Sequence, residues 1–285
     1  MRDYRKEYWQ GKIARQIAID YEKYGREHKL YTKTTKLLLD FLGLKIYKKI
    51  IDLGCGTGFS SELIAKKFRN LKKLYCIDSS KEMLCIAKTK FTRNRRLIFI
   101  FSKAENISKI DDKVDLVLSN ASFQYFEPNK ALNEIKNVLK NNGLFVFNIW
   151  PVWYKEMRQS KEFINFFKLF YKNMNEIANQ QGYKSEFNYK FELGNTYGFL
   201  SLRILKKLFK KHSFKLIKYE EIPIDRSIQD YLDFLSMPSI SKHRLPNVPI
   251  ENRKRIFKKA MSLTTSKINY KSISHKWPFF LVKKI

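Results

Sequence analysis

Three glycines at alternate positions mark the part of the sequence best suited to bind a ligand. Gly54, Gly56 and Gly58 follow the apolar, strand-like residues 50–53, and a helix-like segment begins at Phe59. Glycines let the backbone approach a ligand closely, and the first turn of a helix offers free N–H groups. The pattern predicts a strand, a glycine turn and a helix that together bind a polar or nucleotide-like ligand.

The spacing of these glycines favours one class of ligand over another. Dinucleotide folds use G-x-G-x-x-G, whereas this turn reads G-x-G-x-G, with Cys55 inside it and Asp52 ahead of it. A carboxylate beside the glycines repels a pyrophosphate but suits an ammonium. No G-K-[ST] follows, which excludes a P-loop. Asp78 lies twenty residues beyond Gly58, about where a doubly wound nucleotide fold uses a carboxylate to bind ribose hydroxyls.

Strand and helix patterns alternate on both sides of this turn. The order predicts a doubly wound α/β fold, with a mostly parallel sheet and helices on both faces. Residues 12–42 are expected to be helical and to end at Gly43, and Ser79 or Ser80 is expected to cap a later helix. The expected strands are 74–77, 97–101, 114–118, 144–149, 214–222 and 277–282, and the expected helices are 59–68, 83–90, 128–140, 153–181, 202–211, 228–235 and 251–263, with a loop at 238–249.

In combination these residues resemble the class I S-adenosylmethionine-dependent methyltransferases, over about residues 10–150. Residues 52–58 are similar to the first motif of that family, Asp78 to its ribose-binding acid, residues 104–107 to its adenine loop and residues 115–120 to its fourth strand. The resemblance implies S-adenosylmethionine as cofactor and no metal. It also implies these cofactor-binding residues: Asp52, Gly54, Cys55, Gly56, Gly58, Asp78, Ser79, Met83, Ala104, Glu105 and Asn120.

One residue departs from the family pattern. Lys103 stands where the family often has an acid that accepts from the adenine amino group, and a lysine has no acceptor. Adenine recognition is therefore expected to rest on Glu105, on backbone groups or on packing by Met83.

The family also implies a Rossmann-like, mostly parallel seven-stranded sheet with helical cap insertions. We expect an N-terminal helical lid at 1–45, a cofactor-binding core at 46–151, and the rest of the sheet with cap insertions, forming the acceptor side, at 152–285.

The segment after the fourth strand bears on the methyl acceptor. Residues 119–126 resemble the S-N-A-x-x-Q-W segment of the malonyl-acyl-carrier-protein O-methyltransferases of biotin synthesis, with Tyr125 in place of Trp, and a related segment of trans-aconitate methyltransferases. Both groups esterify a carboxylate, which is already ionised near neutral pH and needs no general base. No catalytic residue is assigned, and Gln124, Tyr125 and Tyr21 are candidates for positioning. Arg158 and Arg203 are candidates for binding the carboxylate.

Three other functions stay open. A quinone-like or other lipid-like acceptor would suit the aromatic segments 153–171 and 277–280, although helical spacing there also fits an ordinary core. An RNA methyltransferase is supported by charge alone, because the N-P-P-[FY] tetrapeptide of amino-methylating enzymes is absent. A protein that binds S-adenosylmethionine without turnover is the non-enzymatic alternative.

Composition limits the partners and the compartment. The chain has 57 Lys and Arg against 27 Asp and Glu, a formal net charge of +30. This excess of basic residues suits an acidic carrier protein as partner. However, Lys is spread over the whole sequence, which fits compositional drift. We therefore expect no nucleic-acid partner. Three cysteines without metal-site spacing and no apolar run of about 18 residues indicate a cytoplasmic protein without a transmembrane helix. The four histidines lie in no motif.

Overall fold

The structure is a computed structural model that describes residues 13–43, 45–151, 154, 160–188 and 200–285. The chain forms two compact units, which are described separately. Unit 1 comprises residues 1–150, 200–221 and 278–285, and unit 2 comprises residues 151–199 and 222–277. The chain therefore leaves unit 1 and returns to it twice.

A seven-stranded sheet forms the centre of unit 1. Its order is β3-β2-β1-β4-β5-β7-β6. The first five strands pair in parallel and β7 pairs antiparallel with β5, which confirms the mostly parallel, doubly wound α/β fold. The strands are β1 (Lys49–Leu53), β2 (Lys73–Asp78), β3 (Leu97–Phe101), β4 (Val114–Ser119), β5 (Leu139–Asn148), β6 (Phe214–Ser227) and β7 (Ser272–Lys284), of which β6 and β7 also extend into unit 2.

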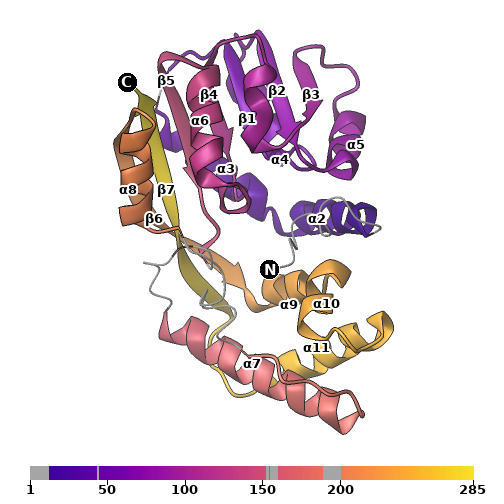
Figure 1. Cartoon of the computed structure of the whole chain (residues 1–285). Coiled ribbons are helices and arrows are strands. Elements are labelled where there is room, and N and C mark those ends of the chain that lie inside the picture. The colour runs from indigo at the N-terminus through magenta and orange to yellow at the C-terminus, as the bar shows by residue number, and fades with distance from the viewer. Residues whose placement is uncertain (1–12, 44, 152–153, 155–159, 189–199) are drawn as a thin grey trace. The chain divides into compact units, whose positions relative to one another are not determined.

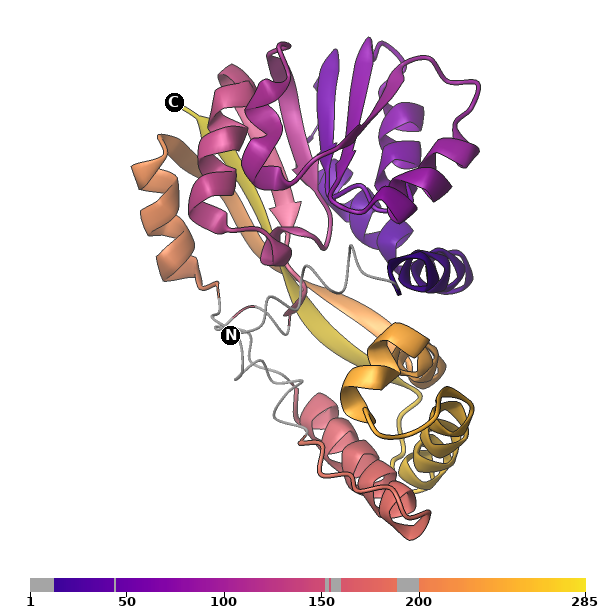
Figure 2. The same cartoon turned by 45° about the vertical axis from the view of Figure 1, so that its right-hand side comes forward.

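Helices cover both faces of this sheet. One face carries α3 (Leu30–Phe41), α4 (Phe59–Lys67) and α5 (Lys81–Lys90), and the other carries η1 (Ala104–Lys109), α6 (Pro128–Val138) and α8 (Leu202–Lys211), as Figures 1 and 2 show. The short η2 (Phe123–Tyr125) follows β4, and α2 (Ala14–His28) packs against α5. The central strands are buried on both sides, which explains their continuous apolar runs.

The expected N-terminal helix is two helices. Lys29 adopts a left-handed conformation, with φ of +55°, and it separates α2 from α3. Gly43 has φ of +69° and its N–H donates to the Asp40 carbonyl oxygen, so a left-handed glycine closes this segment as expected. The periodicity of apolar residues continues across Lys29, which is why the sequence alone did not predict the break.

Unit 2 contains α7 (Lys161–Gln180), α9 (Ile228–Ser236), α10 (Pro238–Arg244) and α11 (Ile250–Thr265). The aromatic side chains of α7 are buried against one another and against neighbouring helices. Phe166 stacks on Phe170, and Phe170 stacks on Phe257 of α11. These rings therefore form the core of unit 2, as their helical spacing predicts.

Some expected boundaries were wrong. The loop expected at 238–249 begins instead with α10, because proline is compatible with the first position of a helix. Residues 141–143, which lie between the expected helix 128–140 and the expected strand 144–149, belong to β5, where the register with β4 shifts between Val114 and Leu116. The helix expected from residue 153 begins instead at Lys161, and the Ser160 side chain caps its N-terminus. Residues 152–153 and 155–159 lie outside the described part. Within the described residues, no helix is long and apolar enough to cross a membrane.

Candidate functional site

The glycine turn connects β1 to α4 and is fixed to the end of β2. The N–H groups of Gly54 and Cys55 both donate to the Ile77 carbonyl oxygen, at 2.8 and 3.0 Å. Gly54, Gly56 and Gly58 all have positive φ, of +74°, +54° and +92°, which favours glycine at each position. A Cβ atom at Gly54 would collide with Ser122, whereas one at Gly56 would meet no atom within 4 Å. Gly56 therefore borders open space into which a ligand could fit.

Asp78 holds this turn from the end of β2. One carboxylate oxygen accepts from the Gly56 N–H at 2.8 Å, and the other accepts from the Ser80 N–H at 2.9 Å. Burial raises the pKa of Asp78, and the N–H groups of Ser80, Gly56 and Ser79 oppose that rise. The Ser80 hydroxyl accepts from the Met83 N–H and so caps α5. The carboxylate of Asp78 and the open side of Gly56 therefore lie next to each other.

Asp52 is fully buried at the end of β1, with one carboxylate oxygen lacking a partner. Its Oδ2 accepts from the Ser61 hydroxyl at 2.6 Å, whereas Oδ1 has no hydrogen-bond partner among the described residues. Burial raises the pKa of Asp52 to about 7; the Ser61 hydrogen bond opposes this and the nearby Asp78 adds to it. A buried carboxylate with an unpaired oxygen is costly, and a cationic donor would satisfy it. This carboxylate suits an ammonium group.

The residues expected around an adenine are mostly engaged within the protein. The Glu105 carboxylate accepts from the Glu127 N–H at 2.6 Å, at the start of α6. Met83 is buried against Ile17 of α2, and Lys103 is exposed. Ala104 is buried at the start of η1. Met83 packing and backbone groups remain available for adenine recognition, and Glu105 uses one carboxylate oxygen to accept from the Glu127 N–H.

The three positioning candidates lie together. Burial raises the pKa of Tyr125, and hydrogen bonds with Gln124 and Tyr21 oppose that rise. Gln124 also donates to the Ala121 carbonyl oxygen at 2.7 Å and accepts from the Trp150 N–H at 3.4 Å. Residues of the segment 119–126 that follows β4, called the β4 loop, and of α2 thus meet. The amide of Asn120, in contrast, turns away toward α3 and is hydrogen-bonded to Thr35.

Contacts between aromatic rings and ion pairs hold α2 and α3 beside the glycine turn. Tyr21 of α2 stacks on Tyr31 of α3, and Tyr31 stacks on Phe59 at the start of α4. Glu22 pairs with Lys90 of α5 at 2.6 Å. The N-terminal helices therefore pack on the elements that form the candidate cofactor site.

The two arginine candidates, Cys55 and the histidines complete the set of residues considered from the sequence. Arg203 is exposed on α8, and Arg158 lies outside the described residues. Burial raises the pKa of the Cys55 thiol well above its usual range, so Cys55 lines the turn as a neutral group. The described part of the chain contains no cluster of metal-ligating side chains. His212 contacts Asn129, and His275 is buried in unit 2.

Sequence reasoning missed three polar residues that support the site: Thr35, Ser61 and Asn148. Ser61 binds Asp52, and Thr35 and Asn148 bind Asn120. Asn148 offered a signal, because it is a polar residue at the end of the buried apolar strand β5. A buried amide in such a position needs a partner.

A family model described as a methyltransferase domain matches residues 51–147, which include the glycine turn, Asp78 and the β4 loop. The chain carries an S-adenosylmethionine-dependent methyltransferase domain. Over a longer alignment of 230 residues, which covers 78% of each chain, the chain is 27% identical to malonyl-[acyl-carrier protein] O-methyltransferase 2 of Ilyobacter polytropus. Malonyl-[acyl-carrier protein] O-methyltransferase 1 of the same organism is 33% identical over 145 residues, which cover 50% of this chain and 53% of that relative.

Solved structures share the fold of this methyltransferase. Phosphoethanolamine N-methyltransferase 2 of Haemonchus contortus, in complex with phosphomonomethylethanolamine and S-adenosylhomocysteine, superposes with a TM-score of 0.57 at 16% identity. The match covers 97% of this chain and 59% of that one. At such identity the likeness concerns the fold, and the acceptor has to be argued from residues.

Proposed function

We propose that this methyltransferase transfers the methyl group of S-adenosylmethionine to a carboxylate oxygen of a small acyl substrate, with a malonyl group on an acyl-carrier protein as the best candidate. The observation that carries the proposal is the chemistry of the β4 loop. Tyr125 is the one titratable side chain in residues 119–126, and burial raises its pKa. A protonated phenol is no general base, so the acceptor should already be a nucleophile, as a carboxylate is at neutral pH.

The cofactor is proposed to bind at the glycine turn. The open side of Gly56 would face it, the Asp78 carboxylate would accept from the ribose hydroxyls, and Asp52 would face the ammonium of the methionine part. Gly54, Cys55 and Gly58 shape the turn, and Ser79, Met83 and Ala104 border the adenine side. When bound, S-adenosylmethionine supplies a methyl group that its sulfonium already activates.

The protein's own task is to hold donor and acceptor in line. Gln124, Tyr125 and Tyr21 are joined by hydrogen bonds, so they present a fixed polar group beside the site. Holding two reactants at near-contact distance lowers the barrier without any acid or base. Binding of the acceptor carboxylate is left to donors of the β4 loop.

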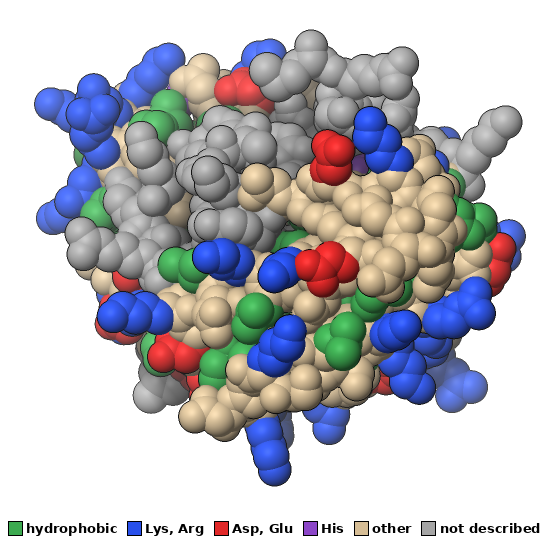
Figure 3. All heavy atoms as spheres, turned by 90° about the horizontal axis from the view of Figure 1, so that it is seen from below, with side chains coloured by type: hydrophobic (Ala, Val, Ile, Leu, Met, Phe, Trp, Pro, Cys, Tyr) green, Lys and Arg blue, Asp and Glu red, His purple; other side chains and the backbone are tan. Residues whose placement is uncertain are grey.

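The relatives' names and the residues point to the same acceptor class. Two relatives are named as malonyl-[acyl-carrier protein] O-methyltransferases. The lipid-like alternative relied on the aromatic segments, and the α7 rings are packed in the core of unit 2. The RNA alternative relied on charge, and Lys and Arg are spread around the face drawn in Figure 3, without one dominant patch.

Methyl transfer to a panel of acceptors tests this proposal. Labelled S-adenosylmethionine is supplied with malonyl-acyl-carrier protein, aconitate, a quinone precursor or bulk RNA. We expect label on the malonyl carrier that mild alkali releases as methanol, because esters hydrolyse in base whereas N-, C- and ether-linked methyl groups do not. Label found in RNA alone would reject the carboxylate. Cofactor binding without transfer to any acceptor would favour the non-enzymatic alternative.

Asp78→Asn tests the cofactor site independently of the acceptor. The amide keeps the shape of the side chain and one oxygen for a backbone N–H, but it loses the charge that favours two ribose hydroxyls. Charged hydrogen bonds contribute about 1.5–3 kcal/mol each, so we expect affinity for S-adenosylmethionine in calorimetry to fall at least tenfold. Unchanged affinity with an unchanged thermal midpoint would remove Asp78 from the proposed site.

A further inference from the structure

A buried hydrogen-bond network joins α3 to the ends of β4 and β5 in unit 1. Asn120 donates through Nδ2 to the Thr35 hydroxyl at 2.9 Å and to the Tyr31 carbonyl oxygen at 3.1 Å. Its Oδ1 accepts from Asn148 Nδ2 at 2.9 Å. Asn148 Oδ1 in turn accepts from the Ala121 N–H at 2.6 Å. Thr35 and Asn148 are fully buried and Asn120 is 8% exposed, so water scarcely competes for these groups.

Backbone groups at both ends of the network fix the orientation of both amides. The Tyr31 carbonyl can only accept, so the NH₂ of Asn120 must face it. The Ala121 N–H can only donate, so the oxygen of Asn148 must face that group. The remaining oxygen of Asn120 and NH₂ of Asn148 then match each other. The positions of Asn120 and Asn148 each need a side chain with both a donor and an acceptor. Neither an aspartate nor an alanine supplies both.

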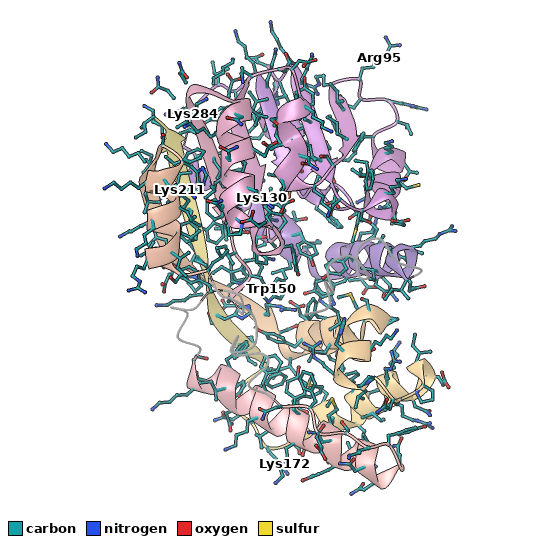
Figure 4. The ribbon with its side chains drawn as sticks, in the orientation of Figure 1. Arg95, Lys130, Trp150, Lys172, Lys211 and Lys284 are labelled. Atoms are coloured by element: carbon teal, nitrogen blue, oxygen red, sulfur yellow. The ribbon has the colours of Figure 1, made fainter. Side chains whose placement is uncertain are left out.

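The network terminates at a strained residue. Ala121 has φ of +51°, a left-handed conformation that a residue with a Cβ rarely adopts and that needs support from its surroundings. The hydrogen bond from its N–H to Asn148 gives that support. The Ala121 carbonyl oxygen accepts from Gln124 Nε2, so the conformation of Ala121 sets where Gln124, and through it Tyr125, lies. Trp150, labelled in Figure 4, completes the support through its N–H.

We propose that Asn120, Asn148 and Thr35 are positioning residues for the β4 loop, which they hold by stabilising Ala121 in its left-handed conformation, and that the Asn120 side chain is not a cofactor ligand. The amide of Asn120 uses its two N–H groups and its oxygen within the protein. Because Thr35 belongs to α3, the network also couples the N-terminal helices to the loop that faces the acceptor. The kinetic readout below rests on the proposed function, whereas the exchange readout does not.

Thr35→Val and Thr34→Val form a matched pair for the test. Both threonines are fully buried on α3, and the Thr34 hydroxyl bonds to the Leu30 and Tyr31 carbonyl oxygens of its own helix. The Thr35 hydroxyl donates to the Tyr31 carbonyl oxygen, shares a hydrogen bond with the Ser60 hydroxyl and accepts from Asn120. We expect Thr35→Val to speed amide hydrogen exchange in residues 120–126 about tenfold, the scale of one buried hydrogen bond. Thr34→Val should leave that exchange unchanged, and Thr35→Ser should restore the slow exchange.

Asn148→Ala and its combination with Ala121→Gly test the strained residue itself. Glycine adopts positive φ without a steric cost. We expect Asn148→Ala to lower kcat about tenfold or more while the Kd for S-adenosylmethionine changes less than about threefold, and Ala121→Gly to recover part of the lost kcat. A weaker Kd with unchanged kcat would assign the network to cofactor binding and overturn the proposal. Unchanged exchange in residues 120–126 of both Thr35→Val and Asn148→Ala would also overturn it, even if no acceptor had been found.

Discussion

We expect the Asp52 oxygen that lacks a partner among the described residues to link the proposed cofactor binding to pH. Burial raises the pKa of this carboxyl to about 7. A bound ammonium favours the ionised form, so binding lowers that pKa and releases a proton. At pH 6 most Asp52 is protonated in the free protein, and we expect affinity for S-adenosylmethionine to be about tenfold weaker than at pH 7.5.

Calorimetry in buffers of different ionisation enthalpy measures both the affinity and the released proton. Asp52→Asn is the matched variant, because it keeps the shape and cannot ionise. It should bind more weakly and with little dependence on pH up to about 7.5, below the pKa of an α-amino group near 8. The same pH dependence in wild type and Asp52→Asn would assign the effect to another group.

The positions of some residues in the candidate site could be predicted from the sequence, and those of others could not. The glycines and Asp78 were predictable, because a positive φ and a strand-end carboxylate at fixed spacing leave a local pattern. Thr35 and Ser61 left no such pattern in the sequence. Their hydroxyls contact residues 85 and 9 positions away in the chain, so their roles depend on the tertiary fold.

At the scale of elements, α2 is held close to α4 by a glycine. A Cβ atom at Gly25 would overlap the Phe59 ring. In a free helix, alanine is favoured over glycine by about 1 kcal/mol. We expect the opposite sign here: Gly25→Ala should destabilise unit 1 by about 1–3 kcal/mol, the usual cost of overpacking.

Denaturant unfolding of Gly25→Ala measures this free-energy change. Combining it with Phe59→Ala provides the control, since the smaller side chain removes the clash and should recover much of the loss that Gly25→Ala causes. A gain in stability from Gly25→Ala alone would mean that α2 does not pack on Phe59 in solution.

Element order was largely predictable and element boundaries were not. The alternation of apolar strands and amphipathic helices indicated the parallel sheet, since buried strands are apolar throughout. Lys29 and Pro238 show the limit. A left-handed lysine breaks an otherwise periodic helix, and a proline begins a helix where it was expected to remain in a loop. Proline is compatible with the first position of a helix, so Pro238 alone does not separate a loop from a helix start, and the left-handed Lys29 leaves no pattern in the sequence.

At the scale of the whole molecule, the net charge of +30 is distributed over both units. Arg95 in unit 1 and Lys172 in unit 2 are exposed and point away from the ribbon in Figure 4. Such a distribution supports general attraction to an acidic partner and does not identify a docking face. The division into two units could not be predicted from the sequence either, because unit 2 is assembled from segments on either side of α8.

The two units should respond to pH in opposite directions. The folded pKa of Asp52 in unit 1 is raised to about 7 from about 4 in an unfolded chain, so its contribution to stability is lost as pH rises from about 4 to 7. The pKa of His275 in unit 2 is held well below its usual value by burial and by Arg226. Its contribution is complete above about pH 6.5 and is lost as pH falls below that value.

Amide hydrogen exchange at pH 5 and pH 7.5, corrected for intrinsic rates, separates the two effects. Relative to wild type, Asp52→Asn should stabilise β1 increasingly as pH rises, by up to about 1.4 kcal/mol per pH unit. His275→Gln should stabilise α9, which Tyr231 links to His275, increasingly as pH falls. A parallel pH dependence of wild type and variant in either unit would show that the buried group keeps an ordinary pKa there.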